Sequence, residues 1–341
     1  MCKKKIVISA AVFAVLAIII LCLLTRLVSP KYSEHLVEGS MTSQYYSEDR
    51  EHDLIIIGDC EVYANISPMI LWEQYGITAY VRGNSQQLIW QSYYILSETL
   101  KYEIPKAVVL SVGSMRYSEP VKEEYNRLAI DLMRWSEDKI GIIRASMGED
   151  ESFASYLFPI IRYHSRITEL TSEDFRYFFS TKRNTFNGFL MEKDTVPYSG
   201  FPRETLRDPD FAESNYIWLD KICALCNENS IRLILFKAPR IYPVWFDEYD
   251  AQISEYAAER GLEYYNFDRL RDEIGIDYSQ DTYDGGMHLN VCGAEKLSGY
   301  FGRILAESGL PDRRGDDVVL TLYNEKLEKY INARESDNNR R

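Results

Sequence analysis

Short apolar runs alternate with longer amphipathic stretches along most of this 341-residue chain. The apolar runs predict strands at Asp53–Gly58, Ala79–Val81, Ala107–Val112, Arg232–Phe236 and Glu263–Phe267. The stretches between them predict helices at Pro68–Tyr75, Gln86–Lys101, Asn215–Glu228, Asp247–Arg260 and Val291–Ser308. Because strands that alternate with helices are typical of parallel βαβ units, we expect an α/β fold. Its form would be a three-layer sandwich around a five-stranded parallel sheet.

One long stretch, from about Glu119 to Asp210, interrupts this alternation. It is rich in aromatic residues and predicted to be largely helical, and Pro159 should kink or end any helix there. We interpret the stretch as an insertion between the third and fourth strands. It either forms a cap or partner surface, or simply covers the core. Its cluster Arg162-Tyr163-His164-Ser165-Arg166 favours a structural network with Glu169 or Asp174 over binding of an anionic glycan or phosphate.

The N-terminus has the pattern of a membrane anchor. Three lysines at positions 3–5 precede an uncharged apolar run from Ile6 to Thr25, which is long enough to cross the roughly 30 Å hydrocarbon core as a helix. The lysines should remain cytoplasmic, which places the rest of the chain outside the cell membrane. A cleavable signal peptide is the rival interpretation, but the run is longer than the usual ~7–15 apolar residues and no small-x-small site follows it.

The predicted organisation follows from these segments. It comprises a cytoplasmic N-terminus (1–5), a single-pass signal anchor (6–26), a polar connector (27–51), an α/β domain (52–310, with the insertion at about 119–210) and a charged C-terminal tail (311–341). The tail contains one amphipathic segment around Val318–Ile331, followed by an end that we expect to be disordered.

Charge and cysteine content narrow the function classes. A formal net charge of −13 argues against nucleic acid, whose phosphates would be repelled. Of the six cysteines, Cys2 and Cys22 belong to the anchor, and the remaining four are too few for a disulfide scaffold. Cys223 and Cys226 fall inside a predicted helix, which favours packing over a redox or zinc role. No metal or organic cofactor is expected.

Chemically interesting residues collect at the carboxyl ends of the predicted strands, where open α/β sheets bind their ligands. In chain order these strand ends carry Cys60, Gly83-Asn84, Gly113-Ser114-Met115 and Lys237-Ala238-Pro239, and Asp284 and His288 follow the last strand. This convergence on one edge predicts a single site there. Lys237 and Arg240 are candidates for substrate contact, with plain surface solvation as the alternative.

These residues resemble the SGNH/GDSL hydrolase superfamily, whose sheet is flavodoxin-like. Gly58-Asp59-Cys60 is similar to the Gly-Asp-Ser block and Gly83 to the glycine of the second block. His288-Leu289-Asn290, followed by Gly293-Ala294-Glu295-Lys296, is similar to the histidine block and closing helix. With its anchor, the chain looks most like the membrane-anchored branch that includes teichoic-acid D-alanylation and alginate-acetylation proteins.

The resemblance implies an acyl esterase or acyltransferase that acts on a cell-surface glycan or polymer, with a membrane-bound O-acyltransferase as an expected partner. Cys60 would be the nucleophile, His288 the base and Asp284 the residue that orients His288. The oxyanion would be held by backbone N–H groups of Cys60 and Gly83, with Asn84 as a substitute for the family's third-block asparagine.

The chain departs from the family pattern in three places. Cys60 replaces the serine, and Gly285 stands three residues before His288, so the orienting acid must be Asp284 or Asp281. Met115 stands where the third-block asparagine would be, and losing one oxyanion donor typically costs about 2.7–4 kcal/mol.

Three alternatives for Cys60 therefore stay open. It can be a working nucleophile, because a thiolate is strongly nucleophilic. It can instead fill a turn in a non-catalytic binding or assembly subunit of a surface-polymer acylation system. It can also pair with Cys292, which lies four residues after His288.

Overall fold

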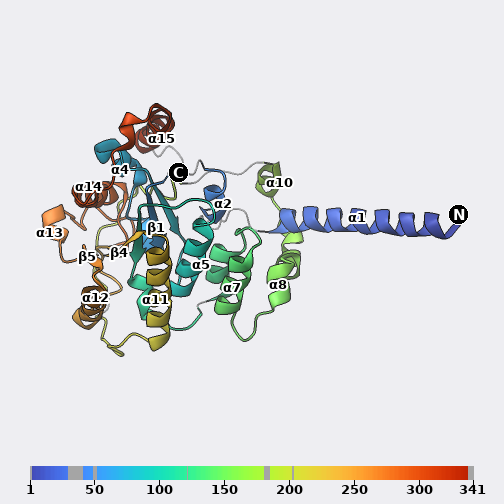
Figure 1. The fold of residues 1–341 in the computed structure, drawn as a ribbon, viewed down its shortest axis with the longest axis horizontal. Helices are drawn as coiled ribbons and strands as arrows, with labels where there is room; N and C mark the ends of the chain where they lie inside the picture. Colours follow the sequence, from blue (N-terminus) through green and yellow to red (C-terminus); the bar gives the residue numbers. More distant parts are fainter. Residues whose placement is uncertain are drawn as a thin grey trace.

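The protein has an α/β fold around one five-stranded sheet in which every strand pair is parallel (Figure 1). The computed structural model describes residues 2–29, 41–48, 52–120, 122–179, 185–201 and 203–336. The strands are β1 (Leu54–Gly58), β2 (Ala79–Gly83), β3 (Ala107–Ser111), β4 (Arg232–Lys237) and β5 (Glu263–Asn266), in the order β2-β1-β3-β4-β5. This doubly wound order confirms the predicted fold class.

The central strand β1 shows why the sequence predicts the sheet so well. All its residues are buried, since helices cover both faces, and such strands consist of continuous apolar runs. Leu54 pairs with Ala79 of β2 on one side and with Ala107 of β3 on the other. The register brings the carboxyl ends of the strands, where the candidate site residues lie, to one edge of the sheet.

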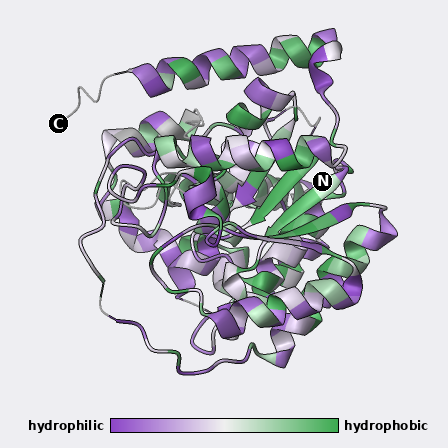
Figure 2. Cartoon of the chain, turned by 90° about the vertical axis from the view of Figure 1, so that its left-hand side faces the viewer, coloured by the Kyte–Doolittle hydropathy of each residue, from purple (hydrophilic) through white to green (hydrophobic). Residues whose placement is uncertain are grey.

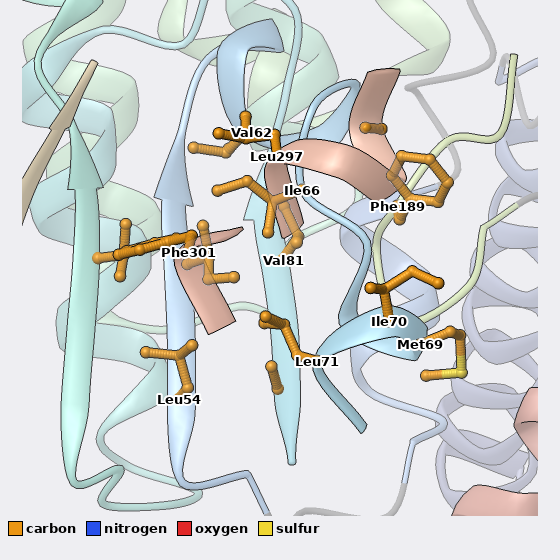
Figure 3. Packing of buried hydrophobic residues seen from close by; sticks show 14 of the residues in the cluster. Leu54, Val62, Ile66, Met69, Ile70, Leu71, Val81, Phe189, Leu297 and Phe301 are labelled. Carbon is orange, nitrogen blue, oxygen red and sulfur yellow. The ribbon is translucent and has the colours of Figure 1, made fainter. Parts of the chain in front are cut away.

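One face of the sheet is covered by helices from the two ends of the domain. These are α3 (Cys60–Tyr63), α4 (Pro68–Tyr75), α14 (Val291–Glu307) and α15 (Asp317–Glu335), with the short α13 (Arg271–Ile274) and η4 (Arg313–Gly315) beside them. Figure 3 shows Leu54 and Val81 of the sheet packed with Leu71 of α4 and Leu297 and Phe301 of α14. Apolar strands lie between helices whose outer surfaces are polar (Figure 2).

The opposite face carries a second apolar cluster. It is covered by α5 (Ile89–Thr99), α11 (Glu213–Glu228) and α12 (Asp247–Arg260). Ile55, Ile57 and Leu110 of the sheet pack there against Leu219 and Ile253. Each face of the sheet thus has its own core.

The C-terminal helix α15 is an integral part of this domain rather than only an amphipathic segment of a tail. Trp72 of α4 packs against Tyr323 with ring centroids 4.8 Å apart, and its Nε1 donates to Asn324 Oδ1 at 3.1 Å. Tyr323 and Tyr330 are both buried. Helix α15 continues to Glu335, past the predicted end of the amphipathic segment at Ile331, and the last residues of the end expected to be disordered, 337–341, lie outside the described residues.

The segment between β3 and β4 begins with the 3₁₀ turn η2 (Gly113–Arg116) and continues as short helices. These are α6 (Glu123–Ile130), α7 (Glu137–Ser146), α8 (Phe153–Leu157), α9 (Ile160–Tyr163), η3 (His164–Thr168) and α10 (Ser172–Phe179). The chain breaks at Pro159 as predicted, because α8 ends before it and α9 begins after it. Ile130, Ile143 and Tyr156 form a third apolar cluster with Ile95 of α5. Arg166 pairs with Asp174 at 3.0 Å, one of the structural pairings expected from the sequence.

The N-terminal helix α1 (Cys2–Val28) projects away from the domain (Figure 1). Within the described residues it is the one helix long and apolar enough to cross a membrane. Its base packs on the insertion, since α9, η3 and α10 all contact it. Arg166 Nη1 donates to the carbonyl of Val28 at 2.6 Å, and Val28 is buried. Part of the predicted connector, residues 30–40 and 49–51, lies outside the described residues, while Met41–Tyr45 form helix α2.

Candidate active site

The nucleophile candidate lies on a tight turn between the central strand and a helix. β1 ends at Gly58, Asp59 caps the next helix by accepting from Glu61 N at 3.1 Å, and Cys60 is the first residue of α3. A side chain at Gly58 would collide with Ser111 of the neighbouring strand β3, so the close approach of the two strands requires glycine. Cys60 is half-buried and its thiol is free.

The acid and base candidates lie on the loop that precedes α14. His288 Nδ1 is 2.6 Å from Asp284 Oδ2, and the backbone N of His288 donates to the other carboxylate oxygen at 2.8 Å. The Asp284 carboxylate thereby fixes both the ring and the backbone of His288. Because Nδ1 is bonded to Asp284, Nε2 is the ring nitrogen available to the thiol.

Two consecutive glycines allow an acid four residues before the histidine to reach its ring. Gly285 and Gly286 both have positive φ, 76° and 100°, which favours glycine. The Gly286 N–H donates to Thr282 Oγ1 at 2.7 Å, and its carbonyl accepts from Ile241 N at 2.7 Å. This compact turn brings the Asp284 carboxylate beside the His288 ring.

Asp281, the other acid considered from the sequence, has different partners. It is buried and pairs with Lys296 Nζ at 2.6 Å, and it accepts from Asp277 N at 2.8 Å. Of the two acids, Asp284 is therefore the one placed to orient His288.

The electrostatic environment couples His288 to Cys60. Burial of the imidazole opposes its protonation, but the electrostatic interaction with Cys60 and hydrogen bonding with Asp284 outweigh burial and raise the pKa of His288 to about 10. Within the described residues Nε2 has no hydrogen-bond partner, whereas Nδ1 is held by Asp284. Cys292, the proposed disulfide partner of Cys60, is exposed and its thiol is also free.

The two oxyanion candidates at the end of β2, Gly83 and Asn84, differ in their surroundings. A side chain at Gly83 would approach Val62 Cγ2 to 2.8 Å and the Gly58 carbonyl to 3.1 Å, so Gly83 lies directly against the nucleophile turn. The Asn84 side chain is buried, donates to Gln87 Oε1 at 2.8 Å and accepts from Thr42 Oγ1 at 3.1 Å. That network holds the Asn84 amide among protein partners.

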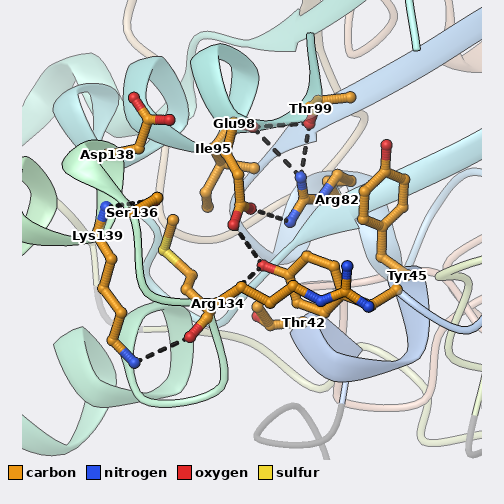
Figure 4. Close-up of polar contacts among 12 residues, drawn as sticks. Thr42, Tyr45, Arg82, Ile95, Glu98, Thr99, Arg134, Ser136, Asp138 and Lys139 are labelled. Carbon is orange, nitrogen blue, oxygen red and sulfur yellow. Dashed lines mark hydrogen bonds and ion pairs between the residues drawn. The ribbon is translucent and has the colours of Figure 1, made fainter. Parts of the chain in front are cut away.

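A larger polar network continues from Asn84 toward α5. Arg82 of β2 is buried and donates to Glu98 Oε2 at 3.1 Å and to Thr99 Oγ1 at 2.6 Å (Figure 4). Its guanidinium also lies 4.0 Å from the centre of the Tyr45 ring. These contacts anchor the carboxyl end of β2 and hence the position of Gly83.

At the third strand end, the position expected for the family's asparagine is occupied by an apolar side chain. Met115 is fully buried in the apolar cluster of the second sheet face. Its carbonyl accepts from Asn215 Nδ2 at 2.8 Å, which fixes the turn η2. A side chain at Gly113 would approach Glu61 Oε1 to 2.8 Å, so this turn lies close to the residues around the nucleophile.

The residue after Cys60, Glu61, belongs to a buried cluster of charged side chains. Glu61 is fully buried, and its Oε1 is 3.0 Å from both Lys237 Nζ and Arg240 Nη2. Burial opposes ionisation of Glu61, but Arg240 and Lys237 lower the pKa of its carboxyl to about 2. Burial and the Glu61 charge raise the pKa of the Asp59 carboxyl, which favours its neutral form next to the thiol.

Lys237 and Arg240, considered for substrate contact, therefore belong to this cluster. Lys237 has no exposed surface, and burial lowers the pKa of its ammonium. Arg240 is 6% exposed, its Nε has no described hydrogen-bond partner, and it is electrostatically coupled to Cys60. Arg240 is thus the cation of the pair whose charge interacts with Cys60.

Sequence reasoning missed two positioning residues, Glu61 and Asn65. Asn65 Oδ1 accepts from Leu289 N at 2.8 Å and so ties the segment after Cys60 to the loop that carries His288. A glutamate inside an apolar stretch directly after the nucleophile was an available signal for a buried ion pair. The Asn65 contact spans 224 residues of sequence, and no local pattern reveals it.

Comparison with known proteins finds only distant structural similarity for this chain. No protein-family model matches the chain, and no curated protein matches it significantly. Among solved structures it is similar to one assigned to the G-D-S-L family of lipolytic proteins from Desulfitobacterium hafniense, with 15% identity, 74% of this chain and 98% of that chain covered, and a TM-score of 0.35. It is also similar to a GDSL-like lipase from Bacteroides thetaiotaomicron, with 11% identity, 80% and 99% coverage, and a TM-score of 0.37. At these values neither likeness bears on the chemistry of this chain.

Proposed function

We propose that this chain is an extracytoplasmic, membrane-anchored SGNH-like acyl esterase or acyltransferase that acts on a cell-surface glycan or polymer through a cysteine nucleophile. One observation carries the proposal. Asp284 holds Nδ1 of His288 at 2.6 Å, and the same imidazole is electrostatically coupled to Cys60 on the strand-to-helix turn, so that Nε2 would serve as the base for the thiol. A nucleophile, a base and a residue that orients the base are the parts that acyl transfer needs.

The proposed reaction proceeds in two steps. Cys60 Sγ attacks the acyl carbonyl while its proton resides on His288, and the tetrahedral intermediate collapses as His288 protonates the leaving alcohol oxygen. The resulting thioester is then attacked by water or by an acceptor hydroxyl, whose proton passes to His288, and Cys60 leaves. Asp284 holds the imidazolium in place throughout.

Charge development on the carbonyl oxygen would be met by backbone donors. The N–H of Cys60 belongs to the first turn of α3, where helical N–H groups lack intrahelical partners, and Gly83 lies against the same turn. Arg240 would add positive charge beside the sulfur, while Lys237 acts only by holding Glu61. Asn84 would contribute only by leaving Gln87 and Thr42.

The anchored, extracytoplasmic location is part of the proposal. It is supported by the buried Val28 and its bond to Arg166, because cleavage of α1 would remove a segment that the domain holds. Three lysines before the apolar run favour a cytoplasmic N-terminus. A membrane-bound O-acyltransferase is the partner that an anchored acyl-transfer protein of this kind would use.

The alternative is a catalytically inactive binding or assembly subunit of a surface-polymer acylation system. Buried Met115 and the engaged amide of Asn84 favour it, because neither residue offers the oxyanion the side-chain amide that the family's third block supplies.

Hydrolysis of p-nitrophenyl acetate by the purified full-length chain separates the two functions. We expect Cys60→Ala and His288→Ala to lose activity by roughly 10³-fold or more, and Asp284→Asn by about 10²–10⁴-fold because the base loses its orientation. Cys292→Ala is the matched control, since this thiol is exposed and lies outside the triad. Equal rates for wild type and both alanine variants would establish the inactive subunit instead.

A further inference from the structure

The helices at the base of α1 carry apolar side chains that no described part of the chain covers. We call α8, α9, η3 and α10 together the collar (residues 153–179). Figure 1 shows α8 and α10 on either side of α1 where it enters the domain. The exposed apolar residues of the collar are Leu157, Phe158, Ile161, Ile167 and Phe175, which are 43–57% exposed. Exposed apolar side chains gathered in this way mark an interaction surface.

The collar is firmly attached to α1. Arg166 Nη1 donates to the Val28 carbonyl at 2.6 Å, and the Arg26 guanidinium lies 5.4 Å from the centre of the Phe178 ring. The described residues of α1 are exposed up to Leu24, whereas from Thr25 onward all but Arg26 are half-buried or, at Val28, buried. The domain therefore first contacts α1 where its apolar run ends.

This position defines the height of the collar relative to a bilayer. If the run Ile6 to Thr25 fills the hydrocarbon core, Val28 lies only about 4.5 Å beyond it at 1.5 Å per residue. The headgroup layer is about 5–7 Å deep on each side of the core. A collar that touches α1 at Val28 therefore lies at headgroup depth, where apolar side chains can reach the acyl chains.

The charge of the collar fits the same environment. Its basic residues Arg162, Arg166 and Arg176 are balanced by Glu169, Glu173 and Asp174, which gives no formal net charge. The whole chain has a formal net charge of −13, and an anionic lipid surface would repel such negative charge. The neutral collar is not repelled in this way.

We infer that the collar is a membrane-docking surface that inserts its exposed apolar side chains into the outer leaflet around α1. Together with α1 it would hold the domain at a fixed height and orientation, so that Cys60 acts at a constant distance from the lipid surface. The inference goes beyond the proposed chemistry and rests only on the anchor part of the proposed function.

Depth-dependent fluorescence quenching of the full-length chain in lipid nanodiscs tests this docking. Cys2, Cys22, Cys60 and Cys292 are replaced by serine, and the buried Cys223 and Cys226 are kept. A nitrobenzoxadiazole label is then attached to a single cysteine at Phe158→Cys, Ile161→Cys or Ile167→Cys, and nanodiscs with brominated acyl chains are compared with unbrominated ones. We expect roughly twofold or stronger quenching at these positions.

Two matched positions make every outcome decisive. Val15→Cys on α1 reports whether the anchor is in the bilayer, and Val318→Cys, 78% exposed on α15, reports on a surface that should remain in water. Quenching at the collar and Val15 but not at Val318 supports the docking surface. Quenching at Val15 alone overturns it and leaves the anchor standing, whereas no quenching at Val15 overturns both. Quenching at Val318 as well would show nonspecific adsorption and also overturn it.

Discussion

At the scale of single residues, the site depends on which charges are buried beside the thiol. Lys237 and Arg240 look like substrate-binding cations in the sequence because they follow a strand, but both contact Glu61 at 3.0 Å. Glu61 lies 176 positions before Lys237, so the pairing cannot be read from local pattern. The location of the site could be predicted from strand ends, whereas the partners of its charged residues could not.

The pKa of His288 gives a prediction at this scale. It is raised from 6.5 to about 10, because burial is outweighed by Cys60 and Asp284. Because the pKa is higher in the folded than in the unfolded chain, protonation of His288 contributes to the stability of the fold. This contribution is complete below pH 6.5 and is lost as the pH rises toward 10. Histidine NMR titration should therefore find one imidazolium that persists above pH 8 in wild type, about 1.5 units or more beyond an ordinary histidine.

The Cys60→Ala variant provides the comparison. Its His288 pKa should fall, because the largest contribution that raises it is gone. The stability advantage of wild type over this variant should shrink between about pH 7 and pH 10. His288→Gln identifies the signal among the four histidines of the chain. An unchanged His288 pKa in Cys60→Ala would contradict the electrostatic coupling between His288 and Cys60.

At the scale of elements, the predicted strands and main helices agree with the structure to within a few residues. β2 continues past the predicted end at Val81 to Gly83, because Arg82 is buried in its pairing with Glu98 rather than exposed. An arginine normally indicates the end of a buried strand, and the sequence does not show its partner. The same reason explains why β4 extends to Lys237.

The Glu61 cluster joins two elements, α3 and β4, and its disruption should be costly. Glu61→Gln leaves Lys237 and Arg240 buried without their counterion, which typically destabilises by about 3–5 kcal/mol. Urea unfolding of the full-length chain measures the loss. The matched control is Asp247→Asn, since Asp247 is 90% exposed and its pair with Arg269 should contribute only about 0–1 kcal/mol. Equal effects of the two substitutions would show that the cluster does not hold α3 against β4.

At the scale of the whole molecule, long-range packing set the limits of sequence-based prediction. The alternation of strands and helices was sufficient for the sheet and its layers. It could not reveal that α15 packs on α4 through Trp72 and Tyr323, since these residues are far apart in sequence. It also could not show that the insertion holds the base of α1 through Arg166. Both contacts connect the chain termini to the domain.

Labelling with a membrane-impermeant maleimide tests the orientation of the whole molecule. Cys2 precedes the apolar run and Cys292 is exposed on α14, so the proposed topology places the two thiols on opposite sides of the membrane. Each is kept in a variant whose Cys22 and Cys60 are serine, while the buried Cys223 and Cys226 should not react. Cys292 should be labelled in intact cells and Cys2 only after permeabilisation. A variant that lacks both thiols gives the background, and labelling of Cys2 alone in intact cells would reverse the topology.

The intact mass of the membrane-bound chain reports whether α1 is retained. We expect the full-length mass, because Val28 at the end of α1 is buried in the folded domain. A mass that lacks α1 would contradict the anchor.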